Sequence, residues 1–302
     1  MTGHFTIPDK FTPVTMEGFA HYELMFEAMP VKPSDYSFVN IFGWADYYGL
    51  EWKFSCNMIW LRQTKPQLLS WSPVGAWQDT DWTMPYAKES LKENGPVFHR
   101  IPEQLAGLWQ SSQAGSIELQ ESRGHWDYIY EAKDLAELSG NRYHRKRNHL
   151  NQFKKIYKDY VYEPMTSEHL PAVLAMQSQW CQWHECKDSP SLAAENYAIQ
   201  RVFAHWDKFP DLSGGIIFLA DEIIAYCVSE ALNSEEVVIH FEKACPNYRG
   251  AYQAINCFHA QDIVKTHPFI NREQDMDDAG IRQAKESYLP KSFLKKCRVV
   301  IK

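Results

Sequence analysis

The sequence lacks the short motifs that identify the commonest enzyme classes. It contains no Gly-x-Ser-x-Gly elbow, no Walker loop, no Rossmann glycine fingerprint and no His-Glu-x-x-His pair. Serine hydrolase, P-loop nucleotide, dinucleotide and zincin chemistry therefore have no motif support. The chain also has no internal repeat and no low-complexity tract, which excludes a solenoid architecture.

The cysteines do not form a recognisable pattern. All seven are scattered, and their number is odd, so we expect no disulfide framework. Cys181, His184 and Cys186 lie close in sequence, but their spacing is not that of a zinc knuckle and no second ligand pair follows. We interpret this segment as a partly buried, aromatic helix end and expect no metal site.

No stretch approaches 18 continuous apolar residues, so we expect no transmembrane segment and at most peripheral membrane contact. The first residues lack the charged-then-apolar layout of a signal peptide. The simplest expectation is a cytoplasmic protein.

What the chain does contain is enough apolar sequence for a large core and one concentrated patch of positive charge. Its 302 residues are 45% hydrophobic and 23% charged, which is typical of a globular protein of roughly two domains. The net charge is −7, yet residues 141–158 carry seven basic and no acidic side chains. Such a local excess in an acidic protein indicates a local anionic partner rather than a wholly basic surface.

The second half of the chain has a readable order of elements. Apolar periodicity and turn signals predict a strand, two helices, three strands, a helix, a strand, a helix and a last strand. The predicted ranges are 160–163, 166–176, 191–206, 215–220, 223–231, 236–244, 250–265, 269–271, 277–286 and 293–301.

The first half is harder to interpret. Helices are predicted over 34–48 and 84–93, and strands over 53–61, 67–71 and 126–130. One long helix is predicted over 132–157, with Gly140 as a point where it can be interrupted.

The order of elements in the second half resembles that of GNAT acyltransferases. In that fold the loop after the fourth strand leads into a helix N-terminus and holds the pyrophosphate of the donor. The corresponding segment here, 245–254, has Arg249 and Gly250 at the expected places. Tyr252, however, stands where a small residue lets the phosphate approach, which counts against coenzyme A.

Three segments resemble one family more specifically. Residues 126–153, 241–256 and 271–290 are similar to the family named for the C-terminal domain of phosphatidylglycerol lysyltransferases, and residues 37–44 are similar to its N-terminal half. The resemblance implies two GNAT-like halves in tandem, as in Fem-type peptidoglycan aminoacyltransferases. It also implies transfer of an aminoacyl group from a charged tRNA to a lipid head group. This sequence has no transmembrane flippase portion.

The predicted fold class is therefore α/β (α+β), with two GNAT-like halves joined by a long basic helix. The expected boundaries are 1–132 for the N-terminal half, 133–158 for the bridging helix and 159–302 for the C-terminal half.

The basic run supplies the first candidate binding residues. They are Arg145, Lys146, Arg147 and Asn148, which could bind the phosphates of a donor. The alternative is an ordinary solvated helix surface. Arg249, Gly250 and Tyr252 of the loop are further donor-binding candidates.

Glu242 is the candidate general base, because it ends the predicted fourth strand beside the donor loop. Strand alternation places Lys243 on the opposite face. The alternative is an ordinary ion pair at a strand end. Tyr288 is a candidate general acid near the last helix, and Lys285 is a further catalytic candidate.

A polar run follows the predicted strand 269–271. Asn271, Glu273 and Asp275 are substrate-binding candidates there, because ligands gather beyond the carboxyl ends of strands. Asp275 or Asp277 could instead cap the next helix.

The sequence thus predicts an acyltransferase whose donor is aminoacyl-tRNA and whose acceptor is a lipid head group or another small nucleophile. Direct attack on the activated ester requires positioning, deprotonation and oxyanion stabilisation. Two alternatives stay open. One is a GNAT-type N-acyltransferase that uses acyl-CoA, and the other is a non-catalytic module that binds a small anionic ligand. No cofactor beyond the donor is expected.

Overall fold

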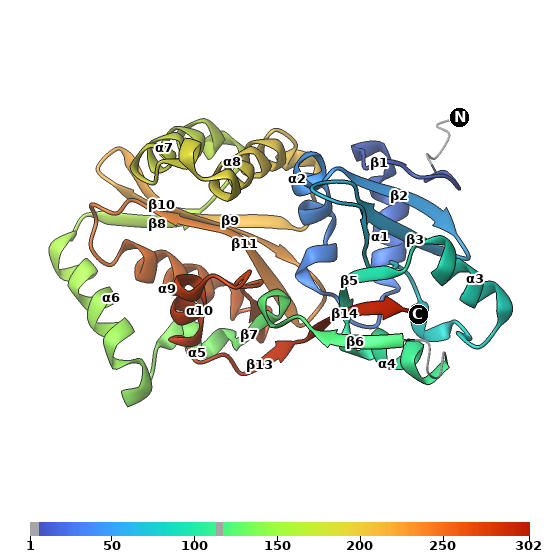
Figure 1. Ribbon diagram of the computed structural model, residues 1–302. Helices are drawn as coiled ribbons and strands as arrows, with labels where there is room; N and C mark the ends of the chain where they lie inside the picture. The colour runs from blue at the N-terminus through green and yellow to red at the C-terminus, as the bar shows by residue number, and fades with distance from the viewer. Residues whose placement is uncertain (1–5, 113–116) are drawn as a thin grey trace. The chain divides into compact units, whose positions relative to one another are not determined.

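The strands of the chain form two seven-stranded sheets (Figure 1). In this computed structural model, residues 6–112 and 117–302 are described. The chain divides into unit 1, which comprises Met1–Asp127, Gln274–Asp278 and Leu294–Lys302, and unit 2, which comprises Tyr128–Glu273 and Ala279–Phe293.

The sheet of unit 1 is mixed. All its pairings are antiparallel except the parallel pair of β4 with β5. Its strands in spatial order are β1 (Thr12–Pro13), β2 (Leu50–Ser55), β3 (Met58–Gln63), β4 (Leu69–Ser70), β5 (Val97–Pro102), β14 (Lys296–Ile301) and β6 (Ile117–Glu121). Its helices are α1 (Phe19–Glu27), α2 (Phe38–Tyr48), α3 (Pro85–Glu93) and α4 (Glu103–Ser112).

Helices cover both faces of this sheet, because the strand side chains alternate. On one face, Trp60 of β3 shares a buried cluster with Leu91 of α3 and Trp109 of α4. On the other face, the ring of Trp52 of β2 lies 6.0 Å from that of Tyr22 of α1. Ser37 caps α2 by accepting a hydrogen bond from the Asn40 backbone N–H. The helix predicted over 34–48 therefore begins at Phe38, directly after its N-cap Ser37.

The sheet of unit 2 is also mixed, with β11 and β12 as a parallel pair. Its strands in spatial order are β8 (Tyr160–Pro164), β9 (Leu212–Leu219), β10 (Glu222–Ala231), β11 (Glu236–Ala244), β12 (Phe269–Asn271), β7 (Asp127–Glu131) and β13 (Ser292–Leu294). Its helices are α5 (Ala132–Glu137), α6 (His144–Ile156), α7 (Leu170–Trp183), α8 (Pro190–Phe203), α9 (Ala251–Ile263) and α10 (Ala279–Glu286).

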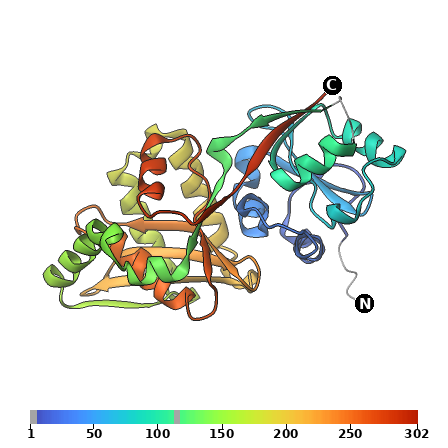
Figure 2. The ribbon, with the colours of Figure 1, turned by 90° about the horizontal axis from the view of Figure 1, so that it is seen from below.

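Unit 2 is built in three layers. Helices α7 and α8 lie on one face of the sheet, and α5 and α9 lie on the other (Figure 1). The view from below shows α6 beside α9 (Figure 2). The main core lies between the sheet and α9, where Ile217, Val237 and Ile255 are buried together.

The two units repeat one order of elements: strand, two helices, three strands, helix, strand, helix, strand. In each sheet one further strand is inserted at the same place, β14 between β5 and β6 and β7 between β12 and β13. This repetition confirms the predicted mixed α/β fold with two GNAT-like halves.

The basic helix differs from its prediction. It is divided into α5 and α6, and both helices pack in the core of unit 2. Leu138 and Gly140 adopt positive φ values of 48° and 79°, which no α-helix contains. Arg147 then donates hydrogen bonds to the carbonyl oxygens of both residues, at 2.6 and 3.0 Å. The break is therefore a specific helix end rather than a kink.

Two predicted strands are also divided. The range 53–61 is a hairpin, because Cys56 and Asn57 turn the chain with φ values of 52° and 58°. The range 293–301 becomes β13 and β14, which lie in different sheets.

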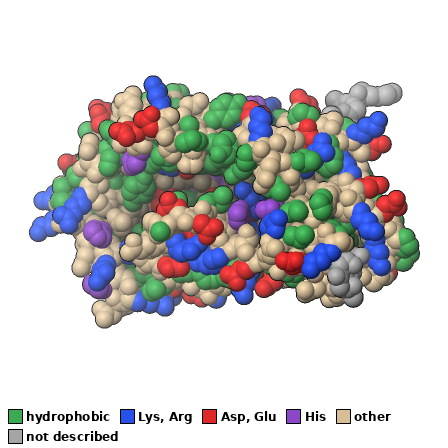
Figure 3. Space-filling view, in the orientation of Figure 1, with side chains coloured by type: hydrophobic (Ala, Val, Ile, Leu, Met, Phe, Trp, Pro, Cys, Tyr) green, Lys and Arg blue, Asp and Glu red, His purple; other side chains and the backbone are tan. Residues whose placement is uncertain are grey.

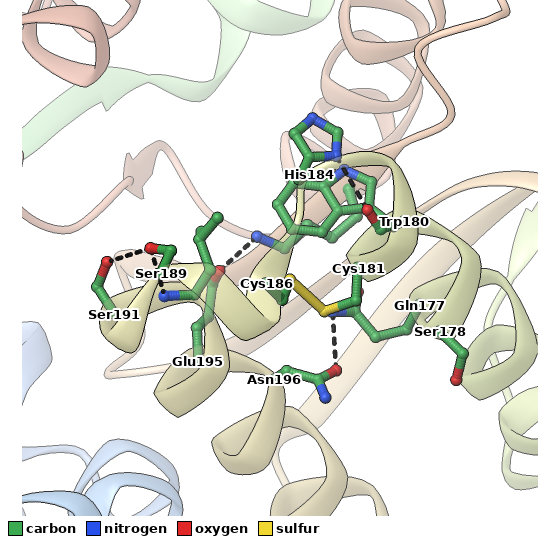
Figure 4. The surroundings of a disulfide bond; sticks show 12 residues. Gln177, Ser178, Trp180, Cys181, His184, Cys186, Ser189, Ser191, Glu195 and Asn196 are labelled. Carbon is green, nitrogen blue, oxygen red and sulfur yellow. Dashed lines mark hydrogen bonds and ion pairs between the residues drawn. A yellow bond between two sulfur atoms is a disulfide. The ribbon is translucent and has the colours of Figure 1, made fainter.

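One expectation about cysteine was wrong. Cys181 and Cys186 form a disulfide at the end of α7, with Cα atoms 5.0 Å apart (Figure 4). Glu185 adopts a left-handed conformation and turns the chain back, so that Cys186 reaches Cys181. The aromatic helix end was predicted correctly, since the rings of His184 and Trp180 stack with their centroids 3.9 Å apart.

Candidate functional site

Polar side chains of unit 2 meet where β11 and β12 stop pairing. The parallel ladder covers only Glu236–Val238 and Phe269–Asn271, while β11 continues to Ala244. Glu242 lies in the part of β11 that extends beyond β12 and pairs with β10 alone. Its Oε1 accepts a hydrogen bond from Arg272 Nη2, and its Oε2 accepts one from Asn256 Nδ2, both at 3.0 Å.

Around this carboxylate lies a set of residues that we call the Glu242 cluster. The guanidinium of Arg272 stands over the ring of Tyr288, 4.9 Å from its centroid. Lys146 of α6 lies on the same ring, with Nζ 4.0 Å from the centroid. The members of the cluster are Glu242, Arg272, Asn256, Tyr288, Lys146 and Gln253, the last of which lowers the pKa of the Tyr288 phenol.

A β-bulge sets the direction of Glu242. Val228 pairs with Phe241 and Ser229 pairs with Ile239, so His240 has no partner across the ladder. The extra residue places Glu242 on the same face as Ile239, which packs in the core beside α9. Lys243 lies on the opposite face and pairs with Glu195 of α8 at 2.7 Å. The prediction that Glu242 and Lys243 face opposite ways is confirmed.

Burial controls the protonation of Tyr288. Its side chain is 6% exposed, and burial raises the pKa of the phenol, so it keeps its proton near neutral pH. Burial lowers the pKa of the Lys146 ammonium, and the neighbouring Arg272 lowers it further. The cluster therefore offers a carboxylate acceptor, a phenol donor and an amine that releases its proton more readily than an exposed lysine.

Two buried atoms of the cluster have no hydrogen-bond partner among residues 6–112 and 117–302. They are Nη1 of Arg272 and Oδ1 of Asn256. Both residues already bind Glu242, so a free donor and a free acceptor flank one carboxylate. Buried polar groups seldom stay unpaired, and this arrangement suits a bound polar group.

A cavity of about 910 Å³ adjoins the cluster. Lys146 and Gln253 belong both to the Glu242 cluster and to the lining of the cavity. The lining comes from α6, α9, α10 and the turn before α6, namely Asn141, Arg142, His144, Arg145, Lys146, His149, Gln253, Gly280, Gln283, Ala284 and Ser287. Lys, Arg and His side chains gather over α6 (Figure 3). The lining contains no carboxylate, so the cavity is suited to an anion.

The predicted donor loop is covered by α6. Gly250, with φ +87°, begins α9 so close to α6 that a Cβ there would lie 2.6 Å from the His149 carbonyl oxygen. The Arg249 backbone N–H donates to the Tyr157 hydroxyl at 3.2 Å. Tyr252 points to α7, where its hydroxyl accepts a hydrogen bond from Trp180 Nε1 at 3.0 Å. The start of α9 is thus in contact with protein rather than open.

The structure brings three predicted residues together, Glu242, Tyr288 and Lys146. Arg145 is exposed in the cavity lining, and Asn148 is exposed on α6. Lys285 extends over Tyr128, 5.6 Å from its ring centroid. Asn271 donates to Glu236 at 3.0 Å, and Glu273 binds His240.

Asp275 belongs to unit 1, where Arg123 pairs with it at 3.1 Å. Arg147 caps α5, as described above. The contacts given above for Asp275, Arg147, Lys285, Asn271 and Glu273 are with residues outside the Glu242 cluster.

Sequence reasoning missed Arg272 and Asn256 as site residues. Arg272 stands in the polar run after β12, and its place directly after a buried strand was a usable signal. Asn256 is 5% exposed on the apolar face of α9. A single amide among apolar helix positions does not indicate which residue it will bind.

The bulged His240 gives a prediction about pH. Its Nε2 and Nδ1 lie 2.8 and 3.0 Å from carboxylate oxygens of Glu230 and Glu273. Burial favours the neutral ring, but the two hydrogen bonds outweigh it and raise the pKa of His240 to about 9. An unfolded histidine titrates near about 6.5. Protonated His240 thus stabilises the fold fully below about pH 6.5, and this contribution is lost as the pH rises through about 9.

We therefore expect the Tm to fall between about pH 7 and about pH 10 by more in the wild type than in His240→Gln. Differential scanning calorimetry over this range checks it. Equal pH dependence in the two proteins would show that His240 is not protonated in the folded state.

Neither a membrane span nor a metal centre is found in the parts of the chain that the structure describes. No helix there combines the length and apolar character needed to cross a bilayer. No group of three or more His, Cys, Asp or Glu side chains among residues 6–112 and 117–302 is arranged to hold a metal ion.

Known proteins similar to this chain support one family. The family model described as phosphatidylglycerol lysyltransferase, C-terminal, matches residues 26–299. An uncharacterised protein of Mycoplasmoides gallisepticum is 30% identical over 181 residues, which are 58% of this chain and 56% of that protein. The chain thus matches little more than half the length of this relative.

Two solved structures are similar over nearly the whole chain. A conserved protein of unknown function from Bacteroides thetaiotaomicron is 27% identical, with a TM-score of 0.87 over 98% of this chain and 100% of that one. The C-terminal domain assigned to a lysylphosphatidylglycerol synthetase in Agrobacterium fabrum is 13% identical, with a TM-score of 0.63 over 93% and 91%. The second likeness concerns the fold alone.

Proposed function

Because this chain belongs to the phosphatidylglycerol lysyltransferase C-terminal family, which points to acyl transfer, we propose that unit 2 transfers an aminoacyl group from a charged tRNA. The acceptor in this proposal is a small nucleophile such as a lipid head group. The observation that carries the proposal is the carboxylate-free basic cavity that adjoins the Glu242 cluster.

The cavity supports a donor that carries phosphates. Arg145 and Lys146 line it, and Gln283 of α10 adds a neutral donor. Arg142 is held by Asp134 at 2.7 Å, which fixes a further guanidinium at its rim. Phosphodiester groups bind to such clusters through charge and counterion release.

The covered start of α9 favours tRNA over coenzyme A. A GNAT-type pyrophosphate would need the N–H groups at that helix N-terminus. The approach of His149 to Gly250 takes up this space with backbone. An acyl-CoA donor would require α6 to move away, whereas a donor entering beside α6 and α10 would not.

The cluster supplies the groups that direct acyl transfer requires. Glu242 is placed to accept the proton of the attacking amine or hydroxyl. The Tyr288 hydroxyl, which keeps its proton, and Arg272 Nη1 are placed to stabilise the developing oxyanion. The ester bond to the tRNA ribose breaks as the new bond to the acceptor forms, and the proton taken up by Glu242 passes to the leaving ribose oxygen.

Binding of the donor can be tested with one double variant. Arg145→Gln combined with Lys146→Gln removes up to two phosphate contacts and should lower the slope of log affinity against log salt by about 1.4 to 1.8. Filter binding of aminoacylated tRNA over a range of salt concentrations measures this. Lys154→Gln combined with Lys155→Gln is the matched control, because it removes the same charge from the same helix outside the cavity.

Equal salt slopes in the two double variants would contradict a role of the cavity in donor binding. Absence of any tRNA binding by the wild type would contradict the tRNA donor itself. Arg147 is left unchanged in both variants, because it caps α5.

A further inference from the structure

A second polar network lies under the sheet of unit 2, apart from the residues of the Glu242 cluster. Ser213 of β9 lies 2.8 Å from Ser229 of β10, Oγ to Oγ. Ser229 Oγ lies 2.8 Å from Nε2 of His259 on α9. The other ring nitrogen, Nδ1, is 3.2 Å from the Tyr162 hydroxyl, which donates to Asp262 Oδ2 at 2.8 Å. We call these five residues the serine relay.

The hydrogen bonds of the serine relay all run in one direction. Burial would raise the pKa of Asp262, but hydrogen bonds from Lys265 and Tyr162 outweigh it, so the carboxylate is ionised and only accepts. Tyr162 gives its proton to Asp262 and must accept from His259 Nδ1–H. Burial lowers the pKa of His259 to about 4, so the ring is neutral and Nε2 accepts.

The same reasoning assigns the donor and the acceptor in the hydrogen bonds of the two serines. Ser229 has one hydroxyl proton and donates it to His259 Nε2, so Ser213 must be the donor to Ser229. The Ser213 proton therefore points inward along the relay, and its oxygen lone pairs point away from it. Hydrogen bonds in such a chain polarise one another.

The backbone around the relay is shaped to accommodate it. Ser229 has no exposed surface, and His259 is 4% exposed. Tyr162 crosses β9 at Gly215, where a Cβ would lie 2.5 Å from the Tyr162 hydroxyl. Ser213, at the other end, is exposed to solvent. The chain of hydrogen bonds thus connects an accessible hydroxyl, that of Ser213, to a buried histidine that is linked to a carboxylate.

We propose that Ser213 is a nucleophile that takes up the acyl group of an activated ester. This site goes beyond the proposed aminoacyl transfer and does not depend on it. Nucleophile, base and orienting group follow the logic of a serine–histidine–acid triad, with Ser229 and Tyr162 as the intervening members.

The step balances without any further reactant. The Ser213 oxygen forms a bond to the carbonyl carbon, and the bond from that carbon to the leaving oxygen breaks. The Ser213 proton passes to Ser229, and the Ser229 proton passes to His259 Nε2. Asp262 stabilises the resulting imidazolium through Tyr162, and the leaving group departs as its oxyanion.

The test uses p-nitrophenyl acetate and the full chain. Release of p-nitrophenolate is followed by absorbance, and the acetylated residue is located by peptide mass spectrometry. We expect one acetyl group on Ser213. Ser213→Ala should abolish that adduct, and Tyr162→Phe, which uncouples His259 from Asp262, should slow its formation by at least about tenfold.

Ser178→Ala is the matched control, because Ser178 is an exposed serine of α7 that only donates to the Leu174 carbonyl oxygen. It should react like the wild type. The proposal is overturned if Ser213 is not acetylated, or if a Tyr162→Phe protein with an unchanged far-ultraviolet spectrum reacts at the wild-type rate. Acetylation of Ser178 at the rate of Ser213 would also overturn it.

Discussion

Glu242→Gln is expected to lower kcat/KM for aminoacyl transfer by at least about a hundredfold. General base catalysis contributes roughly that much or more, and glutamine cannot take up the proton. The substitution keeps the size of the side chain and an oxygen for Arg272, whose Nη2 lies 3.0 Å from Glu242 Oε1. Steady-state kinetics with aminoacylated tRNA and the acceptor measure the loss.

The matched control is Glu235→Gln, an exposed carboxylate in the turn between β10 and β11. It removes the same charge close to β11 and should leave kcat/KM unchanged. Tyr288→Phe should lower kcat more than it raises KM, because the phenol stabilises charge that develops only in the transition state. Full activity of folded Glu242→Gln would remove Glu242 from the mechanism.

Lys296→Met is expected to produce the largest loss of stability, about 3–5 kcal/mol in unit 1. Lys296 is fully buried, and its ammonium pairs with both Asp35 and Asp127, the second at 2.7 Å. Burial raises the pKa of Asp35, but Lys296 and Arg100 outweigh it and lower the pKa. Removing the ammonium leaves two buried carboxylates with one fewer partner.

The corresponding fall in Tm is roughly 6 to 20 °C for a unit of this size. The control is Lys295→Met, since Lys295 is the exposed neighbour in sequence and should cost under about 0.5 kcal/mol. Thermal unfolding of the two variants measures the difference. Equal Tm values would mean that Asp35 and Asp127 are stable without the lysine.

Local sequence patterns predicted the strands and helices whose formation depends on neighbouring residues. The apolar period placed β9, β10 and β11, and their order with α9 and β12 gave the GNAT-like arrangement of unit 2. Glu242 was predicted as a site residue from its position at the end of a strand. Tyr288 was predicted from its place near the last helix, by likeness to GNAT enzymes, and Lys146 from the basic run.

What the sequence could not supply was the set of partners that are distant in the chain. Arg272 and Asn256 bind Glu242 from 30 and 14 positions away, and no periodic pattern encodes that contact. At the bulge, His240 contacts Glu230 and Glu273, which are 10 and 33 positions away in the chain. A count of alternating residues from Val237 would have placed Glu242 on the other face.

Irregular turns account for the remaining differences. The helix predicted over 132–157 is broken because Leu138 takes a left-handed conformation, which is unusual for leucine and is held by Arg147. The segment 293–301 was predicted as one strand, yet its second part joins the sheet of unit 1, where Lys296 pairs with Asp35.

We propose that the Glu242 cluster transfers an aminoacyl group delivered by tRNA. The most direct measurement incubates the purified protein with a full set of tRNAs charged with radiolabelled amino acids, together with phosphatidylglycerol vesicles and small amines. Label should move from tRNA to a lipid or amine with the wild type and with Glu235→Gln, and not with Glu242→Gln. Label that stays on every tRNA, while acetyl-CoA supplies an acyl group to the same acceptors, would show that tRNA is not the donor.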